Sequence, residues 1–279
     1  MKKDLSLIYD YNPTVDYFNS KNIENFLNFL GKDRRKSASS IKKITNTGRN
    51  FFRYLQKINE IPSDLPNPFK VPDDFRTSTK QNSRARFKIE PWIPFKPEEV
   101  VYLYQIARSK EDVQLANLIV IAAYTGARIE EICSLKHKHI DLKNFSLSII
   151  EAKTTAGDRT IPIHSAIQQL VEKLLDESTD DYLISNLNKN KYGERSNAIG
   201  KRFGRLKTAE NFGKKHVFHS IRKTFVTLLE NNSILENIAA DIVGHKKKTM
   251  TYGTYSGGTG LSLMRESIEK ISYPFPELT

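Results

Sequence analysis

The chain has 279 residues, of which 38% are hydrophobic and 10% aromatic, so it can bury a core and is neither a disordered tail nor a disulfide-stapled miniprotein. Its 44 Lys and Arg residues outnumber 32 Asp and Glu residues, and the resulting net charge of +12 favours a polyanionic partner. The single cysteine, Cys133, excludes an internal disulfide and a CxxC zinc site, and favours a reducing compartment.

Neither a membrane span nor a secretory signal is expected. No segment approaches the roughly 18 uninterrupted apolar residues that a bilayer requires. The amino-terminal sequence MKKDLSLIYDYNP has a basic start but lacks the apolar run of a signal peptide. Binding to a lipid surface usually needs a basic helix with an apolar face, whereas the single tryptophan, Trp92, lies among prolines. We therefore expect a cytoplasmic protein with no membrane partner.

The first part of the chain, residues 1–85, is predicted to be a small basic helical domain. Apolar residues at helical spacing predict one helix over residues 22–30 and a longer one over about 38–58. Between Gly31 and Lys57 there are nine basic residues and one acid, so the polar side is almost entirely positive. That side is either a solvated helix face or a surface for DNA. Its candidate DNA-binding residues are Arg34, Arg35, Lys42, Lys43 and Arg49.

A proline-rich stretch separates this domain from a second one. Seven prolines lie from Ile61 through Pro97, together with the polar run TSTKQNSRARFK, which has no apolar period. This composition indicates a linker, which we assign to residues 86–96. The second domain is assigned to residues 97–279.

The second domain is predicted to be rich in helices and to contain one small sheet. The segment PEEVVYLYQIARS has the proline and acids of a helix start, and EDVQLANLIVIAAY predicts a buried helix that ends at Gly126. A short helix follows in ARIEEICSLK, with Cys133 facing the core. Branched residues predict an antiparallel hairpin with strands over 145–150 and 159–163. Further helices are expected at about 165–176, 195–208, 219–231, 234–243 and 261–272. The fold class is therefore mainly α with a small antiparallel β-sheet.

Three groups of residues in the second domain could carry chemistry. Arg128 follows a Thr-Gly-Ala turn at a helix start, where its guanidinium and the helix amides can hold one phosphate. His219 and Arg222 lie three residues apart on a predicted helix and project from one face. The string GHKKKTMTYGTY places His245 and two tyrosines around a basic loop. Each group alone also has a plain structural interpretation, such as a surface salt bridge for Arg128.

In this order, the groups resemble the tyrosine site-specific recombinases, also called the phage integrase family. The matching strings are TGARIEEICSLKHKHIDL, EAKTTAGDRTIPI, HSIRKTF and VGHKKKTMTYGTYSGG, and the resemblance covers about residues 95–275. It implies two phosphate-binding arginines, a lysine on the hairpin, two histidines and a tyrosine nucleophile. At the matching positions these catalytic residues are Arg128, Arg222, Lys153, His219, His245 and Tyr255.

The resemblance also implies a reaction, in which DNA is cleaved through a 3′-phosphotyrosine bond without metal, ATP or another cofactor. Two fixed guanidiniums would stabilise the negative charge that develops when a phenol oxygen attacks a phosphodiester. His219 is the candidate base for the tyrosine proton, and Lys153 the candidate acid for the leaving 5′-oxygen. His245 is expected to hydrogen-bond the phosphate. Tyr252 is the alternative nucleophile, but the match of TYGTYSGG to the family favours Tyr255.

The architecture and partners follow from the same resemblance. A core-binding-like domain and a catalytic domain of the DNA breaking-rejoining fold would clamp double-stranded DNA. Four protomers would join two duplexes, whereas without DNA the protein would be monomeric or weakly associated. Accessory DNA-bending proteins, association with the nucleoid and a mobile genetic element as the source are further expectations. Two rivals stay open: a type IB topoisomerase with a similar pocket, and a non-catalytic DNA-binding regulator that has kept the fold.

Several other residues of the second domain have roles that the sequence leaves open. Glu131 either orients basic neighbours or lies on a helix surface. The run His137-Lys138-His139 does not suggest a metal pair, because positions i and i+2 do not share a helix face. The last helix packs either on its own domain or on a neighbouring subunit. Further DNA-binding candidates are Lys201, Arg202, Arg205, Lys246 and Lys247.

Overall fold

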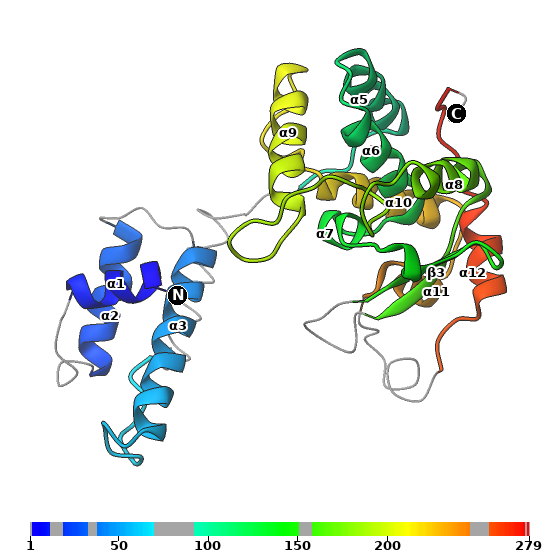
Figure 1. The fold of residues 1–279 in the computed structure, drawn as a ribbon. Coiled ribbons are helices and arrows are strands. Elements are labelled where there is room, and N and C mark those ends of the chain that lie inside the picture. Colours follow the sequence, from blue (N-terminus) through cyan, green and yellow to red (C-terminus); the bar gives the residue numbers. More distant parts are fainter. Residues whose placement is uncertain are drawn as a thin grey trace. The chain divides into compact units, whose positions relative to one another are not determined.

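The structure is a computed structural model that divides the chain into two compact units, residues 1–90 and 91–279 (Figure 1). It describes residues 2–11, 19–32, 38–69, 92–150, 158–245, 257–276 and 278. Each unit has its own hydrophobic core, and the two cores share no residue. None of the helices in these ranges is both long and apolar enough to cross a membrane.

The described residues of unit 1 form three helices. The two predicted helices are present as α2, Ser20–Lys32, and α3, Ala38–Lys57. An additional helix that the sequence pattern did not suggest, α1, Lys2–Tyr11, packs on α3. Apolar side chains at helical spacing on each helix meet in one core, because burying each of them removes its surface from water. The largest members of this core are Phe26, Leu30, Phe52 and Phe69.

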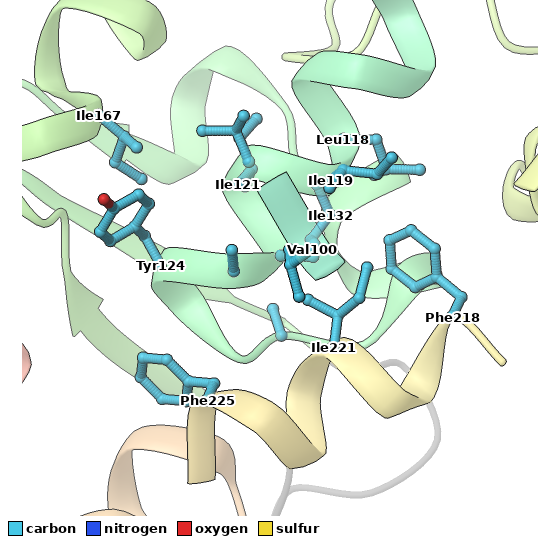
Figure 2. Close-up of a cluster of buried hydrophobic side chains, with 14 of the residues drawn as sticks. Val100, Leu118, Ile119, Ile121, Tyr124, Ile132, Ile167, Phe218, Ile221 and Phe225 are labelled. Carbon is cyan, nitrogen blue, oxygen red and sulfur yellow. The ribbon is translucent and has the colours of Figure 1, made fainter. Parts of the chain in front are cut away.

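Unit 2 is organised around α6, Val113–Thr125, whose side chains are buried on nearly every side. Asp112 caps its first turn by accepting a hydrogen bond from the Leu115 amide at 3.1 Å, and Gly126 ends it with a φ of 60°. Figure 2 shows side chains from several other elements packed around α6. The helices of this unit are α5 Pro97–Ser109, α6, α7 Ile129–Cys133, α8 Gln168–Asp176, α9 Ser196–Ala209, α10 His219–Asn231, α11 Glu236–Val243 and α12 Leu261–Ile268.

A three-stranded antiparallel sheet lies beside these helices, in the order β1-β2-β3. The predicted hairpin is present as β2, Ser146–Ile149, and β3, Arg159–Pro162, with Leu147 opposite Ile161. A third strand, β1, Ile140–Asp141, was not expected. Its two residues pair with β2 after the 3₁₀ turn His137–His139, and no periodic pattern can be read from so short a strand.

Residues 92–96 pack on unit 2, which differs from the linker expected at 86–96. Phe95 is 2% exposed and its ring stacks on that of His216, with centroids 4.7 Å apart. The Ile93 amide donates to the Lys215 carbonyl at 3.2 Å. The prolines on both sides of Phe95 suggested a linker. The sequence pattern therefore did not indicate that Phe95 belongs to the core of unit 2.

The carboxy-terminal part of the chain also packs on its own unit. Helix α12 contacts β3 and α11, and it ends at Ile268 rather than near residue 272 as predicted. The chain beyond it stays buried through Ile271 and Tyr273. Tyr273 and Phe275 meet the ring of Tyr124 on α6, with centroid distances of 5.3 and 5.9 Å.

Candidate active site

Arg128 is positioned by the turn between two helices. The left-handed Gly126 ends α6, and Arg128 then occupies the N-cap position of α7 in an extended conformation, with φ −72° and ψ 151°. Its amide donates to Glu131 Oε2 at 2.7 Å, and its Nη1 donates to Glu131 Oε1. The side chain remains 37% exposed, so its guanidinium can reach a ligand from solvent.

Arg222 lies on α10 and joins the ends of two other helices. Its side chain is buried, with Nη1 donating to the Gly126 carbonyl at 2.8 Å and Nη2 to the Val243 carbonyl at 2.6 Å. These carbonyls belong to the carboxy-terminal ends of α6 and α11, where backbone oxygens lack donors within the helix and carry partial negative charge. The guanidinium is therefore held rigidly between three helices.

The two predicted histidines lie within the field of these arginines. His219 is the first residue of α10, and its pKa is lowered by burial and then by the charges of Arg222 and Arg128. His245 follows Gly244, the left-handed cap of α11, and its amide donates to the Ala240 carbonyl at 2.9 Å. Burial and the same two arginines lower the pKa of His245 as well. Four predicted residues from separate stretches of sequence thus come together, and both imidazoles are neutral near pH 7.

Arg159 belongs to this group too, although sequence reasoning overlooked it. It starts β3, and its Nη2 donates to Glu131 Oε2 at 2.8 Å while its Nε donates to the Ile242 carbonyl at 2.9 Å. Residues two apart on a strand share a face, so Arg159 lies on the same face as the buried Ile161. The sequence did contain one signal for this role, a charged residue on the core-facing side of a predicted strand. Burial of a charge requires a partner, so such a residue is expected to form an ion pair.

Glu131 is the buried partner of both Arg128 and Arg159. Its side chain is only 6% exposed, so of the two interpretations left open by the sequence, the residue orients basic neighbours. Burial alone would raise its pKa, but hydrogen bonds and charge from Arg159, followed by the contacts from Arg128, bring the pKa below its ordinary value. Glu131 is therefore ionised and fixes two guanidiniums relative to each other.

Gly244 allows Arg159 to lie against the chain just before His245. Its φ is +70°, and a Cβ atom at this position would lie 2.8 Å from Arg159 Nη1. Glycine adopts this left-handed conformation at little cost, whereas a larger residue would be strained and would displace the guanidinium. The position of Arg159 and the course of the chain into His245 are thus linked through one glycine.

Two predicted catalytic residues, Lys153 and Tyr255, lie outside the described residues, as does the alternative nucleophile Tyr252. The described chain resumes at residue 257, and Thr259 lies against α11. There Thr259 donates to Asp241 Oδ2 from its amide at 2.8 Å and from its hydroxyl at 2.6 Å. The segment that contains both tyrosines therefore follows His245 at the end of α11 and precedes a residue that is hydrogen-bonded to the same helix.

The other DNA-binding candidates have different surroundings. Lys42 and Lys43 on α3, and Lys201 and Arg205 on α9, are exposed to solvent. Arg49 donates to the Phe69 carbonyl at 2.9 Å within unit 1. Arg202 is held by Asp112, with Nε 2.9 Å from Oδ2, and by Gln114. The remaining candidates, which lie outside the described residues, are Arg34, Arg35, Lys246 and Lys247.

Neither Cys133 nor the described metal-ligating residue types form a further reactive site. Cys133 is fully buried, and burial raises the pKa of its thiol to about 12, so it is a core residue without nucleophilic character at pH 7. Within the described ranges, His, Cys, Asp and Glu side chains do not gather in threes around any point where a metal ion would fit.

The arrangement suits a phosphodiester whose negative charge increases during reaction. Among the described residues of this cluster, the three arginines Arg128, Arg159 and Arg222 outnumber the carboxylate of Glu131, so the cluster is positively charged. Guanidiniums that are already fixed stabilise a developing charge without reorganisation. A neutral histidine beside them can accept a proton.

Comparison with known proteins identifies relatives. The sequence profile of the phage integrase family matches residues 94–258. The tyrosine recombinase XerA of Pyrococcus furiosus is 28% identical over 253 residues, which cover 88% of this chain and 79% of the relative.

Two solved structures share the fold. The Tn1549 transposon integrase in complex with transposon right end DNA is 22% identical, with a TM-score of 0.63 over 92% of this chain and 87% of that chain. The lambda integrase in a tetramer bound to a Holliday junction is 21% identical, with a TM-score of 0.64 over 89% of this chain and 70% of that chain.

Proposed function

Because the chain belongs to the phage integrase family, we propose that it is a site-specific DNA recombinase that breaks and rejoins strands through a 3′-phosphotyrosine intermediate. The observation that carries this proposal is the convergence of Arg128, His219, Arg222 and His245 in one positively charged cluster. These are four of the six positions that the family resemblance assigns to catalysis.

The arginines hold the scissile phosphate. Arg222 is fixed between helix ends and Arg128 is partly exposed, so the two can contact different nonbridging oxygens of one phosphate. His245 donates a hydrogen bond to the same group. As the phosphorus becomes five-coordinate, the added negative charge lies beside guanidiniums that need no rearrangement.

The proton transfers complete the reaction. The Tyr255 oxygen forms a bond to phosphorus and gives its proton to His219, which is neutral because burial and neighbouring cations lower its pKa. The bond from phosphorus to the 5′-oxygen breaks, and Lys153 supplies the proton that the leaving oxygen requires. A 5′-hydroxyl from a second duplex reverses both transfers and rejoins the strand without ATP.

Chain connectivity supports Tyr255 as the nucleophile. Tyr255 precedes Thr259 by four residues, and Thr259 is hydrogen-bonded to Asp241 on the helix that ends at His245. Four extended residues span at most about 14 Å. The connection from Thr259 therefore keeps Tyr255 within about 14 Å of a residue hydrogen-bonded to that helix, which supports its assignment.

The proposed partner is double-stranded DNA, with four protomers assembling on two duplexes. Solved structures of the Tn1549 and lambda integrases contain DNA, and the lambda integrase forms a tetramer on a Holliday junction. The exposed Lys201 and Arg205 on α9 and the basic side of α3 offer phosphate contacts in both units.

The experiment begins with the Tyr255→Phe protein, which binds but cannot react, to select a duplex site from random sequences. Wild-type protein and a plasmid carrying two copies of that site are then scored for covalent adducts and recombinant circles. We expect adducts and recombinants with wild type and with Tyr252→Phe, the matched control, and neither with Tyr255→Phe. Relaxed circles without recombinants would instead identify a topoisomerase, and binding without adducts a regulator.

A further inference from the structure

Trp92 is the single tryptophan of the chain, and it lies beside the candidate base His219. The two ring centroids are 5.8 Å apart and the ring planes are inclined at 65°, so one ring meets the other edge-on. Such edge contacts between aromatic rings stabilise a defined relative orientation. Trp92 is itself half exposed, so the interior does not require its large ring at this position.

The backbone around Trp92 is fixed on both sides of His219. The Ile93 amide donates to the Lys215 carbonyl at 3.2 Å, four residues before His219 in the sequence. Lys223, four residues after His219 on α10, donates from Nζ to the Trp92 carbonyl. These two hydrogen bonds hold the indole against the start of α10.

His219 needs such a contact because its ring is not oriented by a hydrogen bond to any described residue. A catalytic histidine usually has its second ring nitrogen held by a carboxylate or carbonyl, which fixes the ring and the tautomer. The charged and titratable groups that act on His219 are Arg222, Arg128, Lys223 and His245, and all of them disfavour its protonation. None of these groups is a carboxylate or a carbonyl, and no hydrogen bond joins any of them to the His219 ring.

We propose that Trp92 is a positioning residue of the recombination site, which orients the His219 imidazole by its edge contact and shields it from water. This inference rests on the proposed function, in which His219 accepts the proton of Tyr255. Loss of the indole would let the imidazole rotate and would admit water. Both changes slow proton transfer while leaving the arginines in place.

The contact can be tested without any reaction. Because Trp92 is the single tryptophan, all indole fluorescence of the folded protein comes from this position. Protonated imidazole quenches indole fluorescence more strongly than neutral imidazole does. Titration of the DNA-free protein should show emission falling as the pH falls below the ordinary histidine value of about 6.5. The transition should disappear in His219→Ala and persist in His245→Ala, and its survival in His219→Ala would overturn the contact.

The positioning role is tested by single-turnover cleavage of the selected DNA site. For Trp92→Ala we expect the cleavage rate to fall about tenfold, a part of the full contribution of a general base. The affinity for DNA should not change. The rise of the rate with pH should shift to higher pH, because water reaches His219 and its pKa returns towards the ordinary value. Trp92→Phe should restore most of the rate, and Tyr192→Ala, which removes an exposed aromatic residue elsewhere, should behave as wild type.

Each outcome separates the two proposals. Wild-type protein that forms no covalent adduct overturns the proposed function, whereas the fluorescence titration still tests the contact. Wild-type adduct formation together with full activity and an unchanged pH profile in Trp92→Ala overturns the positioning role alone. A Trp92→Ala variant that loses DNA affinity in proportion to activity would also overturn it, since orientation of the base does not alter binding.

Discussion

At the scale of single residues, two consecutive glutamates on α7, Glu130 and Glu131, bind to different elements of the unit. Glu130 accepts hydrogen bonds from the Arg195 amide at 3.0 Å and the Ser196 amide at 2.8 Å, and so satisfies the start of α9. Glu131 has different partners, because it accepts hydrogen bonds from both Arg128 and Arg159. A helix of only five residues therefore links the arginines Arg128 and Arg159 to the basic helix α9.

We expect Glu131→Gln to destabilise the protein by about 3 kcal/mol, because it leaves the buried Arg159 guanidinium without its ionised partner. Urea denaturation followed by Trp92 fluorescence measures the change. Glu98→Gln, at an exposed position in the first turn of α5, is the matched control and should alter the midpoint little. Equal midpoints for both variants would show that the ion pair contributes nothing to stability.

Stability should also depend on the histidines. The pKa values of His139, His164, His219 and His245 are all lowered, with burial as the largest cause. As the pH falls through about 6.5, these histidines therefore bind protons in the unfolded chain while they stay neutral in the folded chain. Below this pH the free energy of unfolding should decrease, until the pH lies below the histidine pKa values of the folded protein. Urea titrations at several pH values should show a smaller decrease in the double variant His219→Gln, His245→Gln.

The candidate site was partly accessible from sequence. Arg128, His219, Arg222 and His245 were found because their types and order resemble a known family. Arg159 and Trp92 were not predicted as neighbours of the site, because their contacts are with residues distant in sequence. Arg159 contacts Glu131 and Ile242, and Trp92 contacts His219. An isolated arginine or tryptophan carries no local pattern that identifies such partners.

At the scale of elements, glycines at two helix ends help to position the clustered arginines. Gly126 ends α6 and supplies a carbonyl to Arg222, while Gly244 ends α11 and leaves room for Arg159. Both have positive φ values. The loops into Arg128 and His245 therefore depend on conformations that side chains with a Cβ rarely adopt.

We predict that Gly126→Ala destabilises unit 2 by about 2–4 kcal/mol, from left-handed strain together with overlap between the new methyl group and Phe225. Gly204→Ala is the matched control, because Gly204 lies inside α9 with open space around it. This control should stabilise the helix by about 0.5–1 kcal/mol. Thermal unfolding of both variants tests the contrast, which a destabilised Gly204→Ala would contradict.

Long periodic segments were the elements that sequence predicted well. Helices α2, α3, α6 and α10 lie within a few residues of their expected limits. The two-residue strand β1 was missed, because tertiary pairing with β2 determines it rather than local pattern. The last predicted helix was too long at its end, since Ile271 is buried by an irregular segment instead of a helical turn.

At the scale of the whole molecule, the two units have separate cores, so we expect each to fold by itself. We predict that residues 91–279 expressed alone unfold cooperatively and keep the emission of Trp92 seen in the full chain. This fragment should bind the selected DNA more weakly and with a shallower dependence on salt, because it lacks the phosphate contacts that we propose for α3. Urea denaturation and binding at several salt concentrations measure these properties, and a fragment without a cooperative transition would refute the independence of the units.

The burial of Tyr273 and Ile271 has a consequence for biosynthesis. Chains emerge from the ribosome amino end first, and their domains generally fold as units in that order. The core of unit 1 has all of its described members once Phe69 has emerged, whereas that of unit 2 still lacks part of its packing until Tyr273 follows. A nascent chain can thus have its basic helices folded while the cluster of Arg128, Arg159 and Arg222 is still incomplete. We expect the ability to cut strands to appear only after Tyr273 has emerged and completed this part of the core.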